Sequence, residues 1–218
     1  MTVPAEGKEG KEGKQGPEGK EGHFAGLSEE EQKKLLAILP YLKYVASGVG
    51  GEPTIQVSGA NLQILNGEGN TDSLNGAGNL IIGYDESPGS QTGSENLVLG
   101  RKQTYTSYGS IIGGSNNTAS GPFSDVFGQE NTASGDSASV SAGNYSTASG
   151  NSASVSAGAF NTASGACASV SAGAHNTASG NSASVSGGTY NTASGEASSI
   201  LGRSFNTVSE PWGLYPAP

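Results

Sequence analysis

Aromatic and imidazole side chains recur at one position of a fifteen-residue repeat in the second half of the chain. The series is Tyr145, Phe160, His175, Tyr190 and Phe205. If the repeats stack as β coils, about 4.8 Å apart, these rings line up as a continuous ladder. Such a ladder serves either as a contact stripe that presents ring faces to a sugar or protein receptor, or as a structural stack against a neighbouring protomer. In neither case is the histidine expected to act in catalysis.

Few other residues offer catalytic or metal-binding chemistry. Besides the ladder histidine the chain contains only His23, and its single cysteine, Cys167, excludes an intrachain disulfide and a multi-cysteine metal site. Residues 131–200 contain two charged side chains, Asp136 and Glu196, whereas calcium-binding repeats need an aspartate in every unit. The sequence therefore predicts no catalytic residue, no metal site and no cofactor, and we expect that the protein is not an enzyme.

The composition is that of a repetitive, fibrous protein. Of 218 residues 36 are glycine, 33% are hydrophobic and 6% are aromatic, which is too few large apolar side chains for an ordinary globular core. The net charge is −9 and no basic stripe with interleaved aromatics occurs, so nucleic-acid binding is not expected. The start, MTVPAEGKEG, lacks the apolar stretch of a secretory signal, and no apolar run reaches the roughly 18 residues of a membrane span. Membrane insertion is therefore not expected.

Residues 1–26 are predicted to form a collagen-like stalk. The segment 7–22 reads GKEGKEGKQGPEGKEG, with a glycine at every third position. A collagen triple helix requires this spacing, because only glycine fits where three polyproline-II chains meet at the axis. The alternative is a charged, disordered linker. Five triplets with one proline are short for a triple helix, so we expect it only where another segment brings three chains together.

Residues 27–50 are expected to be that trimerising segment. Ser28 and Glu31 form the capping box of a helix, and apolar residues follow at the three- and four-residue steps of a coiled-coil seam. The seam, which is the predicted trimer core of this segment, comprises Leu35, Ile38, Leu42 and Val45. Pro40 is expected to kink or split the helix. A short helical bundle of three chains is therefore predicted, and a single helix docked on the head is the alternative.

Short apolar strands alternate with Gly/Asn/Ser turns in the rest of the chain, irregularly over 51–105 and with a period of 14–15 residues over 106–209. A fixed period of this length is typical of a solenoid. Gly135 and Gly143 mark turns that require a positive φ or a close approach of the backbone. One buried apolar slot recurs at Ile64, Ile81, Val98, Ile111, Val126, Val140, Val155, Val170, Val185 and Ile200. The predicted fold class is all-β, with a parallel β-roll or β-solenoid head.

The strand that carries the valines is apolar on both of its faces in the flanking coils. The outward slot of Ser141 is filled there by larger residues, namely Leu99, Ile112, Phe127 and Leu201. Apolar residues on both faces of a strand indicate that both faces are covered. A single coil buries too little apolar surface to offset the roughly 15–30 kcal/mol of backbone entropy lost on ordering it. These four residues are therefore predicted to face a trimer axis.

The phrase NSASVSAGAFNTASG, residues 151–165, resembles the head repeats of YadA-like trimeric autotransporter adhesins. The resemblance extends over residues 95–209 and, more loosely, over 55–94. It implies a left-handed parallel β-roll trimer that binds surfaces or matrix proteins. The glycine-triplet run resembles bacterial and phage collagen-like fibre proteins, whose N-terminus docks on the virion while the C-terminus carries the tip.

Together the two resemblances imply a homotrimeric attachment fibre on a virion or an extracellular surface. Its expected partners are two further copies of the chain, a glycan or protein receptor, and an N-terminal docking partner whose nature the sequence does not indicate. Two other functions compete with this hypothesis. One is an ice- or polysaccharide-binding solenoid, and the other is a passive spacer or filament subunit.

Three further sequence features bear on these hypotheses. Residues 210–218 break the repeat and bring Trp212 and Tyr215 among three prolines, which predicts a cap on the solenoid or, with Arg203, a receptor-contacting tip.

Threonines in the slot of Thr132, each followed two residues later by a serine, predict an outward hydroxyl array suited to ice or polysaccharide. Asparagines at 117, 131, 161, 176, 191 and 206 predict a ladder of stacked amides that stabilises the turns.

Overall fold

The structure, a computed structural model, describes residues 26–216 of the chain. The chain divides into two compact units, Met1–Leu62 and Gln63–Pro218. The secondary structure of the described residues is mostly β with little helix. The predicted collagen-like run at 7–22 lies outside the described residues, so its triple helix stays a prediction.

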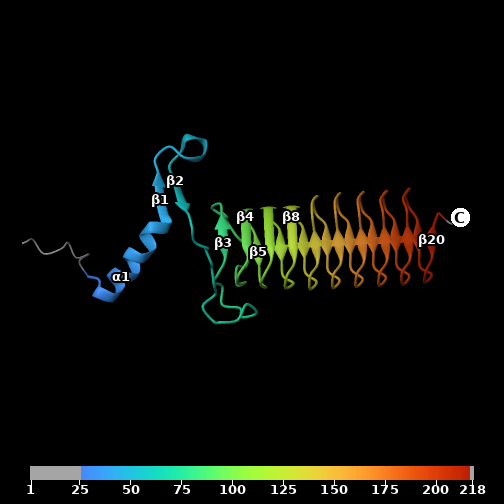
Figure 1. Cartoon of the computed structure of the whole chain (residues 1–218). Helices are drawn as coiled ribbons and strands as arrows, with labels where there is room; N and C mark the ends of the chain where they lie inside the picture. The colour runs from blue at the N-terminus through green and yellow to red at the C-terminus, as the bar shows by residue number, and fades with distance from the viewer. Residues whose placement is uncertain (1–25, 217–218) are drawn as a thin grey trace, which may run out of the picture. The chain divides into compact units, whose positions relative to one another are not determined.

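Helix α1, Glu29–Ile38, opens the described part of the first unit (Figure 1). It begins at the predicted capping box, in which Ser28 Oγ accepts the Glu31 N–H at 3.3 Å and Glu31 Oε2 accepts the Ser28 N–H at 2.8 Å. A short 3-10 helix, Leu39–Tyr41, follows. It ends the α-helix because Pro40 lacks the N–H that would continue the helical hydrogen-bond ladder.

A β-hairpin occupies the residues that follow the proline. Strand β1, Leu42–Val45, pairs antiparallel with strand β2, Thr54–Val57. The loop between them contains a second 3-10 helix, Val49–Gly51. The irregular β-roll coils were predicted to begin at residue 51, but Thr54–Val57 is the second arm of this hairpin.

The predicted helix over 27–50 is wrong beyond Ile38, where α1 ends. Leu35 and Ile38 of the predicted seam lie on α1, but Leu42 and Val45 lie on β1. The stretch LKYV fits a helical seam through Leu42 and Val45, and it fits equally a strand that places Leu42 and Tyr44 on one face. The proline and the pairing with β2 decide for the strand, so a continuous coiled-coil seam does not form.

The second unit is a parallel β-solenoid of about nine coils (Figure 1). Its ten-stranded sheet, called here the valine sheet, contains β3 (Leu80–Ile82), β4 (Leu97–Arg101), β6 (Ile111–Ser115), β8 (Asp125–Gln129), β10 (Ser139–Val140), β12 (Ser154–Val155), β14 (Ser169–Val170), β16 (Ser184–Val185), β18 (Ser199–Ile200) and β20 (Leu214–Tyr215). Its eight-stranded sheet, called the threonine sheet, contains β5 (Thr104–Tyr105), β7 (Thr118–Ala119), β9 (Thr132–Ala133), β11 (Thr147–Ala148), β13 (Thr162–Ala163), β15 (Thr177–Ala178), β17 (Thr192–Ala193) and β19 (Thr207–Val208). The predicted parallel β-solenoid is thereby confirmed.

The interior of the solenoid is a row of branched aliphatic side chains flanked by alanines. Neighbouring coils pair the same positions, as Val140 does with Val155. The fully buried aliphatic row is Val98, Ile112, Val126, Val140, Val155, Val170, Val185 and Ile200. Val208 and Tyr215 pack against this cluster from the last coil. The predicted core slot is therefore confirmed in the regular coils except at β6.

The predicted register is wrong by one residue at β6. Ile112 is fully buried in the aliphatic row, whereas Ile111, which was predicted inside, is 38% exposed. Ile112 is therefore a core residue and does not face a trimer axis. Gly113 takes the outward slot, between Leu99 and Phe127 of the neighbouring strands. Either of the two adjacent isoleucines fits the alternation of apolar residues. Only the pairing of the following residues with β4 and β8 shows that Ile112 is the buried one.

The coils before β4 are less complete than the sequence suggests. Ile64 precedes the first strand of the solenoid and is 38% exposed. Ile81 pairs with Val98 as predicted, but it is 45% exposed because β3 is the edge strand of the valine sheet. The predicted core slot therefore holds from β4 onward, apart from the shift of one residue at β6.

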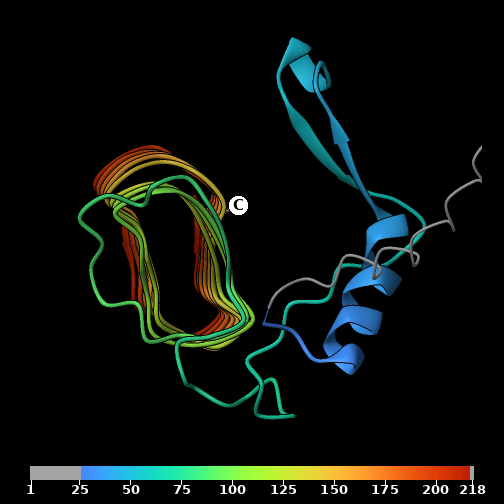
Figure 2. The same cartoon turned by 90° about the vertical axis from the view of Figure 1, so that its left-hand side faces the viewer.

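One inserted residue distinguishes the later coils from the earlier ones. Where Phe127 stands between Val126 and Gly128, two residues, Ser141 and Ala142, stand in the next coil. The valine strand accordingly shortens from five residues in β8 to two in β10. In Figure 2 the orange and red coils bulge at one end of the oblong outline, beyond the green coils. The insertion is absorbed locally, because both sheets keep their register on either side of it.

A ladder of buried amides runs along one corner of the solenoid. Asn176 shows its geometry: Oδ1 accepts the Asn191 N–H at 3.1 Å, and the Asn176 N–H donates to Asn161 Oδ1 at 3.0 Å. Its Nδ2 donates to Ala172 O at 3.2 Å and to Gly188 O at 2.9 Å. The amide members of the ladder are Gln103, Asn117, Asn131, Asn161, Asn176, Asn191 and Asn206, and the Asp85 carboxylate and the Ser146 hydroxyl take the same position in two other coils. The predicted asparagine ladder is confirmed, and it satisfies backbone groups at a buried corner.

Two rows of glycine allow successive coils to approach closely. Gly188 has φ +85°, and a Cβ on it would lie 1.7 Å from a carbonyl oxygen of the next coil. Gly150, at another corner, has an ordinary φ, but its Cβ would lie 2.0 Å from the carbonyl oxygen of the next coil. The predicted turn glycines Gly135 and Gly143 belong to these two rows, the first for close approach and the second also for its φ of +98°. Both physical requirements inferred from the sequence are therefore confirmed.

Asn176→Ala is expected to destabilise the solenoid by about 2–4 kcal/mol, because one backbone N–H and two carbonyls lose a buried partner. Asn176→Ser is the matched control, since Ser146 already occupies this ladder position in a sister coil, and it should destabilise less. Urea denaturation followed by circular dichroism measures both. Equal midpoints for Asn176→Ala and the wild type would contradict a stabilising ladder.

Gly188→Ala should destabilise the solenoid by more than about 3 kcal/mol, since the methyl group meets a backbone carbonyl and the positive φ disfavours a side chain. Its neighbour provides the control. No atom lies within 4 Å of a Cβ at Gly187, and the sister coils carry alanine there, so Gly187→Ala should stabilise by up to about 1 kcal/mol. Thermal melting of the two variants in parallel tests this, and a lower midpoint for Gly187→Ala than for Gly188→Ala would refute it.

Candidate functional site

The predicted ring ladder is present along one edge of the solenoid. From Tyr145 to Phe205, successive ring centroids lie 5.0, 4.8, 4.6 and 5.1 Å apart, and the planes are parallel to within 4°. Every ring residue has a φ between +53° and +60°. Each backbone N–H donates to the preceding coil, as Tyr190 N does to Ala174 O at 3.1 Å. The repeated left-handed backbone is therefore what brings the rings into one stack.

Stacking covers the faces of these rings and leaves their edges exposed. Tyr145, Phe160 and Tyr190 are 43–51% exposed, whereas Phe205, the last ring of the stack, is 78% exposed. A ligand that stacks on an aromatic ring needs an open face, which the inner rings do not offer. The flank therefore presents ring edges, tyrosine hydroxyls and the His175 imidazole. The broad stripe of open ring faces expected from the sequence does not form.

Glu130 occupies the ladder position in the coil before Tyr145. It has the same left-handed backbone, with φ +56°, and the preceding residues of the two coils pair with each other. A hydrogen bond with the Glu130 carboxylate and the negative charge of that group raise the pKa of Tyr145 above its ordinary value of 10.0. The ladder position therefore holds, in the coil on the N-terminal side of Tyr145, a carboxylate that favours the protonated Tyr145 hydroxyl.

The last half-coil places the three residues predicted at the tip in different environments. Trp212 is 77% exposed and has φ +59°. Arg203 is also exposed, with φ +65°. It occupies the position in its coil that Gly188 occupies in the preceding coil. Tyr215 instead pairs with Ile200 and packs against the core cluster. Trp212 and Arg203 are therefore surface residues, whereas Tyr215 closes the core of the last coil, which is the capping role expected of this segment.

The threonine sheet presents two rows of hydroxyl groups. Eight threonines pair in register from Thr104 to Thr207, and all but the last are half-buried. The serines two residues further on, from Ser120 to Ser209, are exposed. The predicted hydroxyl array is thus a real geometric feature. Its use in binding ice or polysaccharide stays a prediction.

The outer face of the valine sheet is apolar toward both ends and lined by serine between them. Leu99 and Phe127 lie in the outward slot, and the Phe127 ring covers Gly113, since a Cβ on that glycine would lie 2.7 Å from Phe127 Cδ1. Leu201, near the other end, is 57% exposed. The serines of the intervening coils, such as Ser171, are exposed. Three of the four residues predicted to face a trimer axis therefore share this face, and the trimer itself stays a prediction.

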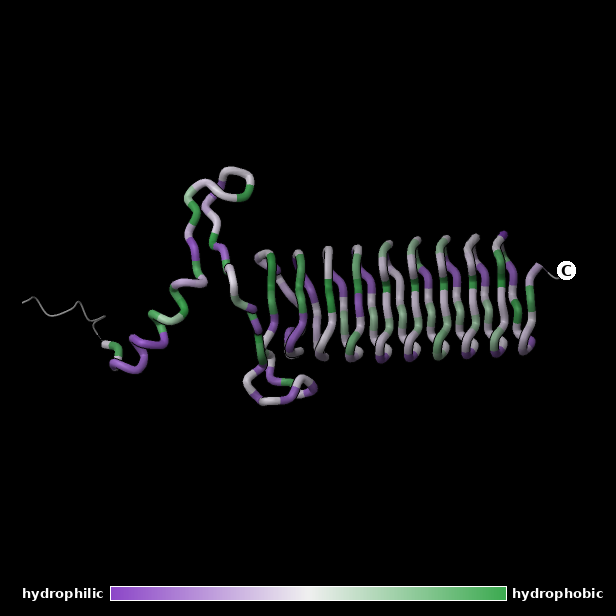
Figure 3. Tube along the Cα trace, in the orientation of Figure 1, coloured by the Kyte–Doolittle hydropathy of each residue, from purple (hydrophilic) through white to green (hydrophobic). Residues whose placement is uncertain are grey.

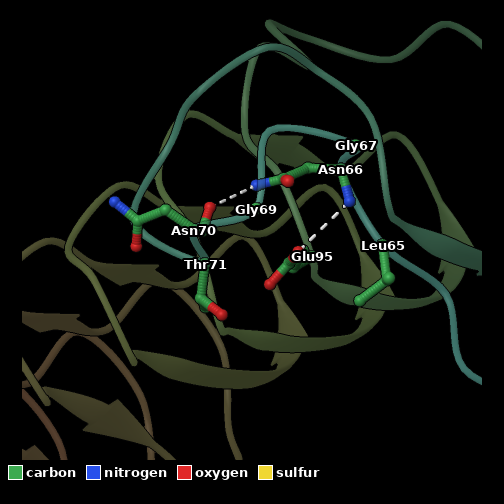
Figure 4. Close-up of a pocket in the computed structure, with 7 residues that line it drawn as sticks. All are labelled: Leu65, Asn66, Gly67, Gly69, Asn70, Thr71 and Glu95. Atoms are coloured by element: carbon green, nitrogen blue, oxygen red, sulfur yellow. Dashed lines mark hydrogen bonds between the residues drawn. The ribbon is translucent and has the colours of Figure 1, made fainter.

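A hollow of about 420 Å³ lies beside the loop that precedes β3 (Figure 4). Its lining residues are Leu65, Asn66, Gly67, Gly69, Asn70, Thr71 and Glu95. The Asn66 N–H donates to Glu95 Oε1 at 3.1 Å, and Asn66 Nδ2 donates to Asn70 O at 2.8 Å. These hydrogen bonds hold the loop in place. The Glu95 carboxylate is the sole ionisable group of the lining. No motif in the sequence marks this hollow, and its only signal is the turn-rich run NGEGNTD, residues 66–72.

Neither the described side chains nor known proteins assign a reaction or a ligand to this chain. Within residues 26–216, no group of three or more His, Cys, Asp or Glu side chains is placed to hold a metal ion. None of the helices in that range is long and apolar enough to cross a membrane. No protein-family model, curated protein or solved structure matches the chain. The fold and its surface rows are therefore the basis for a functional proposal.

Glu130→Gln is expected to lower the pKa of Tyr145 toward 10.0, because it removes the charge that favours the protonated phenol. The raised pKa belongs to the folded state, so this contact stabilises the fold below the ordinary pKa and stops doing so as pH rises through the raised value. Titration of the phenolate absorbance measures the shift. The chain has eight tyrosines, so Tyr145→Phe shows which part of the absorbance change comes from Tyr145. Superimposable titration curves for the wild type and Glu130→Gln would disprove the contact.

Proposed function

We propose that this chain is the subunit of a homotrimeric, non-enzymatic fibre that carries an attachment end away from a virion or cell surface. One observation carries the proposal, namely the unbroken register of the solenoid. From β4 to β20 the valine sheet continues without a break, and the amide ladder runs from Asp85 to Asn206. Coils that are hydrogen-bonded to each neighbour in this way make a stiff spacer.

Two features support three chains in this fibre. The glycine-triplet run at 7–22 needs two further chains to form a triple helix. The outward row of Leu99, Phe127 and Leu201 gives the valine sheet a second apolar face, which a neighbouring protomer would cover. The resemblance to YadA-like adhesin heads implies the same arrangement, with left-handed coils around the trimer axis.

The attachment end is proposed to be the C-terminal half-coil. Trp212 and Phe205 are the most exposed aromatic side chains of the regular coils and the cap, at 77% and 78%, and Phe205 is the ladder ring with an open face. Arg203 adds a positive charge near them in sequence. The flank of the solenoid, lined by serine, threonine and ring edges, is suited to a spacer.

Trp212→Ala is expected to weaken binding of the full chain to an array of cell-surface glycans by at least about tenfold, as truncation of an exposed aromatic anchor does. Tyr190→Ala is the matched control, because it removes a ring whose faces are already covered, and it should bind as the wild type does. Array fluorescence across a concentration series measures both.

Equal losses in the two variants would place the contact on the flank. A trimeric wild type that binds no glycan on the array would favour a passive spacer, and a wild type that sediments as a monomer would contradict the fibre.

A further inference from the structure

One face of the β1–β2 hairpin is entirely apolar. Leu42 pairs with Val57 and Tyr44 pairs with Ile55, so alternation places these four side chains on the same face. They are 44–75% exposed. This surface, called here the hairpin apolar face, therefore remains uncovered within its own unit.

The opposite face of the hairpin has a different character. Lys43 pairs with Gln56, and Val45 pairs with Thr54. Lys43 is the one charged side chain within the two strands, and it lies on this second face. The second face thus combines three polar residues with one valine, and such a contrast with an entirely apolar face is typical of strands that are covered on one side and solvated on the other.

The other described residues of the unit do not cover the hairpin apolar face. No residue between Gly26 and Leu62 is buried. Helix α1 and the turn after it add Leu36, Ile38 and Leu39, which are 47–54% exposed. Figure 3 shows hydrophobic residues recurring along the helix and along both arms of the hairpin. A two-stranded hairpin of this length is marginal in water unless its apolar face is packed against something.

The residues that precede α1 indicate what covers this face. The run at 7–22 has glycine at every third position, which is the spacing that a triple helix of three chains requires. Five residues, 23–27, separate its last glycine from the helix cap at Ser28, and five residues span less than about 18 Å even when extended. Chains that meet in the triplet run therefore deliver three copies of the helix and hairpin to one place.

We propose that three copies of the Gly26–Leu62 unit pack their hairpin apolar faces against one another about a common axis. This inference rests on the proposed homotrimer and names the interface that assembles it. In this interface Tyr44 and Ile55 lie between chains, and Lys43 and Gln56 face water. The trimerising element is thus a helix and hairpin, in place of the coiled-coil bundle that the sequence predicted for 27–50.

Two substitutions in one strand test the interface in the full chain. Ile55→Lys introduces a charge on the hairpin apolar face, and Gln56→Lys introduces the same side chain one residue further on, on the opposite face. Sedimentation equilibrium is expected to show wild type and Gln56→Lys at three times the 21.6 kDa chain mass. Ile55→Lys should raise the dissociation constant of the trimer at least a hundredfold.

A folding control accompanies this measurement. The solenoid belongs to a separate compact unit, so its circular dichroism should be the same in both variants. Ile55→Thr, which keeps a β-branched side chain, should shift the dissociation constant in the same direction but less.

Two outcomes would overturn the inference, and they are distinguishable. Equal trimer stability in Ile55→Lys and Gln56→Lys, with a trimeric wild type, would reject the hairpin interface and leave the proposed homotrimer standing. A monomeric wild type would reject both, and would mean that the face is covered by its own chain or by a different protein.

Discussion

Register between successive coils is the constraint on which the rest of the solenoid depends. The strand hydrogen bonds run from one coil to the next, as from Ser139 N to Ala153 O at 2.9 Å and from Thr147 N to Asn161 O at 2.8 Å. A residue type that recurs once per coil therefore becomes a row in space. The amide ladder, the two glycine rows and the ring stack are four results of this one geometry.

Periodicity explains why the solenoid could be predicted from the sequence. The valine row, the turn glycines and the asparagine ladder each repeat every 14 or 15 residues, so the period reveals them together. The prediction failed where a pattern fits two structures. At β6 two adjacent isoleucines both satisfy alternation, and only the pairing with neighbouring strands excludes Ile111. At 42–45 a helical seam through Leu42 and Val45 competes with a strand that places Leu42 and Tyr44 on one face, and the partner strand β2 lies too far along the chain for a local pattern to reveal it.

The candidate site was predictable in position but not in chemistry. The spacing placed the five rings in one stack, yet whether they present faces or edges depends on the orientation of each ring, which a sequence does not contain. The left-handed backbone at each ring residue and the near-parallel planes decide for edges. Likewise, Trp212 and Tyr215 look equivalent in a proline-rich segment, and only the pairing of Tyr215 with Ile200 separates the core residue from the surface residue.

The one-to-one contact between neighbouring coils also has a consequence for the length of the solenoid. A junction between any two of the regular fifteen-residue coils brings together the same surfaces, valine over valine and glycine over glycine. The loss or duplication of a whole regular repeat would therefore leave every junction between neighbouring coils intact. The length of the solenoid can therefore change in steps of about 4.8 Å without altering any junction between regular coils.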